Sequence, residues 1–171
     1  MILTPSIFQG DISIGQQASE YVQPNIEWFI NKYEPKYCHA VIGKTLYDKL
    51  ISPTDPTNVG VGDVESPPFG VTGGLELVSR LAYPCACFVY FHYMMDSRTT
   101  AMGGGEFGVM AENSERVSPW AKMVRAWNEM VDETPGIMKW IDQSGEYPDY
   151  LPDMKLYIKL GLSRYENMLG I

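Results

Sequence analysis

Apolar residues follow helical patterns in three stretches of this chain, and segments rich in glycine and proline separate them. Residues 75–96 are apolar or aromatic on nearly every face after Arg80. Residues 118–133 carry their apolar side chains on one side only, at Trp120, Met123, Val124, Trp127, Met130 and Val131. A helix that is apolar all round must be enclosed, and a one-sided helix can enclose it. The pattern therefore predicts that the Trp120/Trp127 side of the second helix covers residues 81–95, including Phe88 and Phe91.

The first helical pattern spans residues 23–51. Its apolar side chains recur at three- and four-residue steps, at Ile26, Phe29, Ile30, Tyr33, Tyr37, Val41, Leu46 and Leu50. Pro35 lies inside the pattern and is expected to kink the helix or to split it in two. Gly43 is expected to end one segment, which predicts a helix, a break and a second helix. Residues 1–20 are expected to form an extended lead-in, because their proline and glycines discourage a long helix.

Proline also marks the later helices. Pro84 lies inside the apolar run and is expected to kink that helix, or else to begin a second one. Thr-Pro-Gly at residues 134–136 is expected to stop the one-sided helix, with a short helical piece following over residues 135–143. Residues 145–152 form a turn-rich connector. In the last stretch, residues 154–168, strand-like alternation competes with a helical step, and the pattern slightly favours an extended tail.

Two segments lack a sustained apolar face. Residues 52–74 are dense in proline and glycine, and such a long loop in a compact domain is uncommon. It fits a surface insertion, an arm that touches a neighbouring subunit, or a lid over a small molecule. Residues 97–117 form a glycine-rich arm in which residues 106–110 are expected to be a short strand or half of a hairpin. With the C-terminal tail, residues 153–171, these are the parts expected to reach beyond the helices.

Composition fits one domain over residues 1–171. Hydrophobic residues make up 45% of the chain and charged residues 20%, which is ordinary for a globular protein with its own core. A net charge of −8 argues against a broad nucleic-acid-binding face, which needs clustered lysine and arginine. The N-terminus lacks the basic and apolar regions of a signal peptide. The uninterrupted apolar run, residues 81–95, is shorter than the roughly 18–20 residues that cross a bilayer, so we expect no membrane span. The class predicted is therefore mainly α: a bundle of four to five helices with minor β structure.

The three cysteines are the candidates for metal binding and for nucleophilic catalysis. Cys85 and Cys87 are two residues apart, so on a helix they point about 200° apart and cannot both face one ion. Both lie in the most apolar segment, where thiols are unreactive. With Cys38, they are expected to be reduced core residues in a cytosolic setting. His39 is expected to be partly exposed, and His92 to be a hydrogen-bonded histidine at the edge of the core.

The acidic residues and glycine-rich loops give no catalytic pattern. The candidate carboxylates lie on a face expected to be solvated, at Glu112, Glu115, Glu129, Asp132 and Glu133. Neither glycine-rich loop has the spacing of a phosphate-binding or dinucleotide-binding loop. We therefore expect no catalytic, cofactor-binding or metal-binding residues and no enzyme. The competing enzyme hypothesis requires His39, a thiol and a carboxylate to converge in a pocket.

Three parts of the chain resemble small uncharacterised proteins of Bacteroidetes phages and prophages. Residues 34–50 resemble their helix end with the pattern LG..LYD.L. Residues 88–130 resemble their aromatic helix, short turn, Glu-Asn-Ser segment and helix with a Trp-Asn-Glu-Met core. The closing Asn-x-x-Gly-Ile, residues 167–171, resembles their C-termini. Together these segments cover roughly half of the chain, and the insertion at residues 52–74 departs from the pattern.

That group is similar in helical layout and size to phage head–tail connector (adaptor) proteins, which are mostly α-helical and form rings between portal and tail. The resemblance implies a virion structural protein that acts by self-association. It implies a homo-oligomeric ring, portal or tail components as partners, and location in the cytoplasm of the bacterial host and then in the virion. The acidic charge is compatible with a channel that repels DNA phosphates. The alternative is a soluble helical protein-binding or regulatory module, unconnected with virions, that uses an exposed Trp/Met surface.

Overall fold

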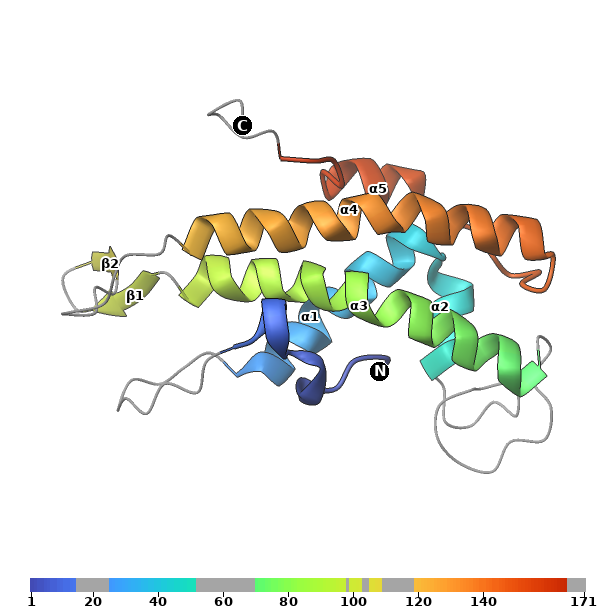
Figure 1. The fold of residues 1–171 in the computed structure, drawn as a ribbon, viewed down its shortest axis with the longest axis horizontal. Coiled ribbons are helices and arrows are strands. Elements are labelled where there is room, and N and C mark those ends of the chain that lie inside the picture. The colour runs from blue at the N-terminus through green and yellow to red at the C-terminus, as the bar shows by residue number, and fades with distance from the viewer. Residues whose placement is uncertain (15–24, 52–69, 98, 103–104, 109–118, 166–171) are drawn as a thin grey trace.

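The computed structural model describes residues 1–14, 25–51, 70–97, 99–102, 105–108 and 119–165. Over these ranges it is mainly α, as predicted, with five α-helices, two short 3-10 turns and one hairpin. The helices are α1 (Ile26–Val41), α2 (Lys44–Ile51), α3 (Gly70–Ser97), α4 (Pro119–Ser144) and α5 (Met154–Lys159). Helices α3 and α4 run side by side along the long axis (Figure 1), α1 lies against α3 and is followed by α2, and α5 packs on α1.

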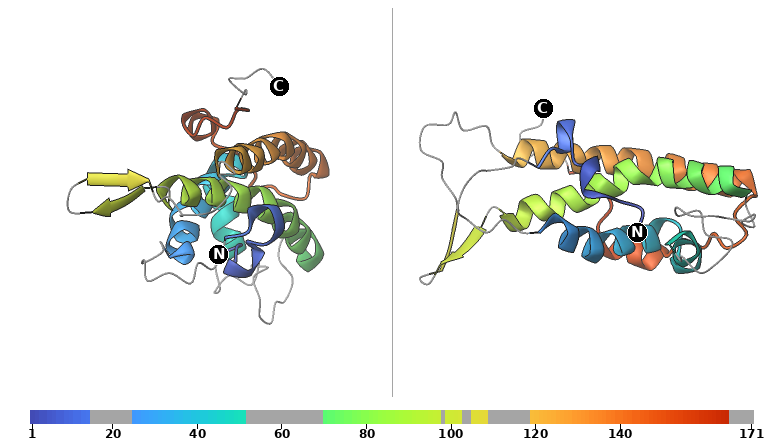
Figure 2. Two further views of the ribbon diagram at one scale, coloured as in Figure 1. Left: turned by 60° about the vertical axis from the view of Figure 1, so that its left-hand side comes forward. Right: turned by 90° about the horizontal axis from the view of Figure 1, so that it is seen from below.

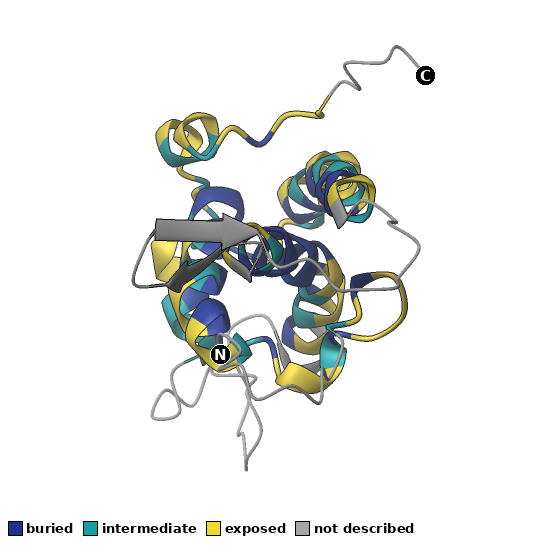
Figure 3. Cartoon of the chain, turned by 90° about the vertical axis from the view of Figure 1, so that its left-hand side faces the viewer, coloured by how far each residue is buried: buried dark blue, intermediate teal, exposed yellow. Residues whose placement is uncertain are grey.

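The predicted packing of α4 over α3 is confirmed. Phe88 and Phe91 are both buried, and the Trp127 ring lies 5.8 Å from the first and 4.6 Å from the second, measured between ring centroids. Trp120, by contrast, remains partly exposed at the start of α4. Figure 3 shows the buried positions turned toward the centre of the helical body. Because α3 is apolar on nearly every face after Arg80, this part of it is what the other helices enclose.

The predicted helix–break–helix is also confirmed. Helix α1 continues through Pro35, so the alternative of a split at that residue is wrong. The break is at Gly43, whose φ of +86° is a left-handed conformation that favours glycine. A Cβ atom at this position would lie 2.1 Å from the Leu151 carbonyl oxygen. The glycine therefore lets the connector after α4 approach the α1–α2 junction closely.

Helix α3 begins earlier than predicted and is a single element. The expected loop was to run to residue 74, but the helix starts at Gly70; residues 52–69 lie outside the described residues. A second helix beginning at Pro84 is wrong, because α3 continues through this proline. The ribbon nevertheless bends partway along its length (Figures 1 and 2). A proline removes one backbone hydrogen bond and crowds the preceding turn, which accounts for a bend within an unbroken helix.

The predicted stop at residues 134–136 is wrong, because α4 runs through Pro135 and Gly136 to Ser144. The expected separate piece over residues 135–143 is the second half of the same helix. Thr134 is buried, and its hydroxyl donates to the Met130 carbonyl oxygen at 2.6 Å. That hydroxyl can then only accept from Tyr37, whose OH lies 2.8 Å away. Burial on both sides of the proline, at Met130, Ile137 and Ile141, offsets the roughly 3 kcal/mol that a proline costs inside a helix.

The expected extended tail is wrong over Met154–Lys159, which form α5. Asp153 caps this helix by accepting from the Leu156 amide at 3.0 Å. Beyond the helix the described chain continues to residue 165, and residues 166–171 lie outside the described part. A hairpin of β1 (Thr99–Met102) and β2 (Gly105–Gly108) confirms the predicted short strand in the glycine-rich arm. It extends past the end of α3 in Figures 1 and 2. Residues 109–118 of that arm, and the proposed cap at Ser118, lie outside the described residues.

Candidate functional site

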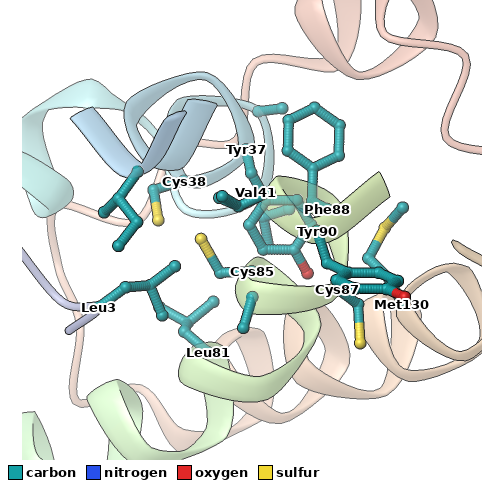
Figure 4. Close-up of a cluster of buried hydrophobic side chains, with 14 of the residues drawn as sticks. Leu3, Tyr37, Cys38, Val41, Leu81, Cys85, Cys87, Phe88, Tyr90 and Met130 are labelled. Carbon is teal, nitrogen blue, oxygen red and sulfur yellow. The ribbon is translucent and has the colours of Figure 1, made fainter. Parts of the chain in front are cut away.

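The three cysteines are core residues, as predicted. All are free and fully buried. Burial raises the pKa of Cys87 to about 12 and that of Cys85 well above its usual value, so both remain thiols near neutral pH. Figure 4 shows the sulfur atoms of Cys38 and Cys85 turned toward one another between α1 and α3, while the Cys87 sulfur points away from both. This divergence of Cys85 and Cys87 is the one that their spacing predicts.

The histidines do not join a thiol in a reactive pair. His92 stacks on Tyr33, with ring centroids 4.1 Å apart and planes 7° apart. Burial, and next the positive charges of Lys36 and Lys32, lower its pKa to about 4, so the ring is neutral near pH 7. His39 is half-buried, its pKa is lowered chiefly by burial, and its Nε2 has no hydrogen-bond partner in the described part of the structure. His39 follows Cys38 on α1, so the two side chains point about 100° apart.

Two of the candidate carboxylates lie together where α3 and α4 meet. Glu129 accepts a hydrogen bond from the Tyr83 hydroxyl at 2.6 Å. Glu133 lies one turn further along α4, and its pKa is raised by burial and then by the Glu129 charge. Glu133 remains exposed, as expected for a solvated face. Asp132 faces a different direction and lies 3.4 Å from Arg164, while Glu112 and Glu115 lie outside the described residues.

A buried carboxylate that sequence reasoning missed is Glu34, on α1. Its two oxygens accept from the Ile2 and Leu3 amides at 2.7 and 2.8 Å, and from the Tyr47 hydroxyl at 2.8 Å. Burial, followed by the Glu34 charge, raises the pKa of Tyr47, so the phenol stays a donor. Glu34 thus ties the N-terminal segment and α2 to α1. The available signal was a charged residue placed four residues after Ile30 on the apolar face of the helix.

The chain after α5 is fastened to α4. The Trp127 indole donates to the Ser163 carbonyl oxygen at 2.8 Å. Asn128 and Tyr165 exchange two hydrogen bonds: the Tyr165 amide donates at 2.9 Å and the Asn128 amide group donates at 3.2 Å. The Tyr165 ring also stacks near Phe91, with centroids 5.7 Å apart. These contacts fix the position of the chain that follows α5.

Three large apolar side chains on α5 and in the connector just before it are exposed, and we call them the apolar stripe: Leu151, Met154 and Ile158. Their exposed fractions are 77%, 49% and 74%. Met154 and Ile158 are four residues apart and lie on one side of α5, and Leu151 precedes the residue that caps the helix. The strand-like alternation in the sequence grouped Met154 and Ile158 with Leu156, but the helix turns Leu156 toward the core. The stripe therefore could not be recognised from the alternation.

In the described part of the chain, the side chains that could act chemically are dispersed. No three histidine, cysteine, aspartate or glutamate side chains there gather as metal ligands would. Nor is any helix there long and apolar enough to cross a membrane. The surface features that stand out are instead the apolar stripe and the carboxylates beside Tyr83. Comparison with protein-family models, curated proteins and solved structures gives no match to this chain.

Proposed function

We propose that this chain is a structural protein of a phage or prophage virion, of the head–tail connector type, and that it acts by self-association and by binding other virion proteins. The observation that carries the proposal is the apolar stripe, where three large side chains face solvent on α5 and just before it, in a part of the chain that is fastened to the body on both sides. Exposed apolar side chains gathered in one place mark surfaces that bind other proteins. The resemblance of residues 34–50, 88–130 and 167–171 to phage proteins supplies the virion context.

The arrangement of the reactive side chains supports a role without catalysis. Cys85 and Cys87 are buried thiols with raised pKa values. His39 does not face the thiol beside it on α1, and Glu34 is saturated by donors from the chain itself. A catalytic set needs its members within hydrogen-bonding reach of one another. The features that remain are surfaces: the stripe, the hairpin of β1 and β2 beyond the end of α3, and the acidic side chains.

The net charge of −8 is consistent with this role. A connector lies where DNA passes between head and tail. Negative side chains facing such a passage repel phosphates, so that the duplex slides without being bound. In this proposal the protein is made in the cytoplasm of the bacterial host and then becomes part of the particle.

Sedimentation velocity of the purified full chain, alone and mixed with the virion proteins encoded by its neighbouring genes, tests the proposal. We expect a species larger than the monomer in the mixture, visible as a ring or as a decorated particle by electron microscopy. A chain that stays monomeric and joins no particle would refute the proposal. A regulatory binding module would instead form a discrete complex with a protein that is not part of the virion.

A further inference from the structure

The apolar stripe is bordered by positive charge. Lys155 and Lys159 lie on α5 beside Met154 and Ile158, and both are exposed. The chain as a whole is acidic, but here two exposed lysines outnumber the one exposed carboxylate beside them, the helix cap Asp153. A surface that combines exposed apolar side chains with lysines fits a partner surface that is apolar and acidic.

The same chain presents a surface of that kind where α3 meets α4. We call it the acidic edge; its members are exposed or half-buried, and they are Leu75, Glu76, Tyr83, Glu129 and Glu133. Tyr83 and Glu129 are held in place by their mutual hydrogen bond. Glu76 is partly neutralised by Arg80, which lies 2.8 Å away, while Glu133 adds a further carboxylate one turn from Glu129. The edge therefore offers an exposed apolar side chain, Leu75, to meet the stripe, and carboxylates to meet the lysines beside it.

The stripe and the edge belong to different sides of the molecule. Helix α5 packs on α1, where the His39 carbonyl oxygen accepts from the Asp153 amide, whereas the acidic edge lies where α3 meets α4. Contact between two different surfaces of identical chains is heterologous, and its repetition gives a closed ring or an open filament. An isologous contact, in which the stripe meets the stripe of a second copy, would instead bring Lys155 and Lys159 of both copies together.

We propose that the apolar stripe of one copy docks on the acidic edge of the next, with Lys155 and Lys159 facing Glu129 and Glu133. This rests on the self-association in the proposed function and names the surfaces that carry it. Three side chains make a patch well below the roughly 800 Å² per partner of a standard interface. A single contact is therefore weak, and the assembly depends on protein concentration and on closure, where each copy uses both surfaces.

Two variants separate the surfaces. Leu151→Asp with Ile158→Asp spoils the stripe and leaves the edge intact. Leu75→Asp with Glu133→Lys spoils the edge and leaves the stripe intact. Since these side chains are exposed, the fold is expected to survive, which circular dichroism and the thermal midpoint check. Met95→Asp, an exposed apolar residue near the end of α3, is the matched control.

Sedimentation velocity over a concentration series is the measurement. We expect the unaltered chain and the control to self-associate as concentration rises, and each double variant alone to stay monomeric. An equimolar mixture of the two variants should form a dimer and nothing larger, because only one good stripe and one good edge remain per pair. Carbodiimide coupling of the unaltered chain should join Lys155 or Lys159 to Glu129 or Glu133 between copies.

Several outcomes overturn the inference. A mixture that forms no dimer excludes the heterologous contact, and a stripe variant that associates like the unaltered chain excludes the stripe. An unaltered chain that is monomeric at every concentration, yet joins particles with the other virion proteins, refutes this contact and leaves the proposed function standing. If it neither self-associates nor joins particles, both proposals fail.

Discussion

Replacing Glu34 with glutamine removes a charge without changing the shape of the side chain. In the folded chain the two carboxylate oxygens accept three hydrogen bonds, from the Ile2 and Leu3 amides and from the Tyr47 hydroxyl. An amide has one acceptor oxygen, and its nitrogen is a donor. If the amide oxygen takes the place of Oε1, it still accepts the hydrogen bonds from the Ile2 amide and the Tyr47 hydroxyl. The new NH2 group then faces the Leu3 N–H, donor against donor.

The cost follows from the two buried donors left without an acceptor. Leaving one buried donor unsatisfied costs about 1–3 kcal/mol, and the bonds that remain lose the assistance of the negative charge. We expect Glu34→Gln to lower the free energy of unfolding by about 3 kcal/mol, which corresponds to a fall of about 6–12 °C in Tm for a chain of this size. Hydrogen exchange should show the largest gain in the N-terminal segment, because Leu3 and Ile12 are held against the core beside this anchor.

Urea unfolding followed by circular dichroism measures the change, and hydrogen exchange with mass spectrometry localises it. Glu27→Gln is the matched control, since Glu27 is exposed on the same helix and its replacement is expected to stay within about 0.5 kcal/mol. If Glu34→Gln unfolds at the same urea concentration as the unaltered chain, or if exchange rises equally everywhere, the carboxylate is not the anchor described here.

Three further predictions test other parts of the fold. Gly43→Ala should destabilise the chain by more than about 1 kcal/mol, because Gly43 has a positive φ and a Cβ atom there would clash with Leu151. The control is Gly136→Ala, in a helix with open space around the position, which should stabilise the chain by up to about 1 kcal/mol. Similar urea midpoints for the two variants would contradict the prediction. The lowered pKa of His92, about 4 in the folded chain against about 6.5 unfolded, gives stability that is complete above pH 6.5 and lost as pH falls to 4, by up to about 3 kcal/mol. His92→Phe should flatten that part of the pH profile, and parallel profiles would argue against it. Thr134→Val leaves the Tyr37 hydroxyl without this partner and should cost about 1–3 kcal/mol; if adding Tyr37→Phe lowers the thermal midpoint by the full sum of the single changes, the two hydroxyls are not coupled.

Periodicity was sufficient to predict the main packing. The spacing of Trp127 and Met130 on a one-sided helix, next to an all-apolar stretch with Phe88 and Phe91, determines which faces must meet. The break at Gly43 was predictable for a local reason, since glycine is favoured where the backbone turns left-handed. Burial of the cysteines likewise followed from their apolar neighbours. These features depend on residues close together in sequence, or on a clear difference between the apolar and polar faces of one helix.

The errors arose where distant residues decide the outcome. Local rules stop a helix at residues 134–136, but the hydroxyl of Thr134 meets Tyr37, 97 positions away, and buried residues on both sides hold α4 together. In the sequence, Glu34 is a charged residue on an apolar helix face. Its role becomes clear only in the fold, where the distant Ile2 and Leu3 amides donate to it. Recognising the stripe required knowing whether residues 154–159 form a helix or a strand, and their sequence pattern fits both.

The continuity of α4 also has a mechanical consequence. Its 26 residues, at a rise of 1.5 Å each, make a rod about 39 Å long. The rod begins on the side of the hairpin and ends at the connector that touches Gly43. Two separate helices would absorb a push at one end by flexing at their joint. A single continuous helix transmits such a push as a tilt of the whole helix. A partner that binds at one end of α4 therefore changes the orientation of the other end.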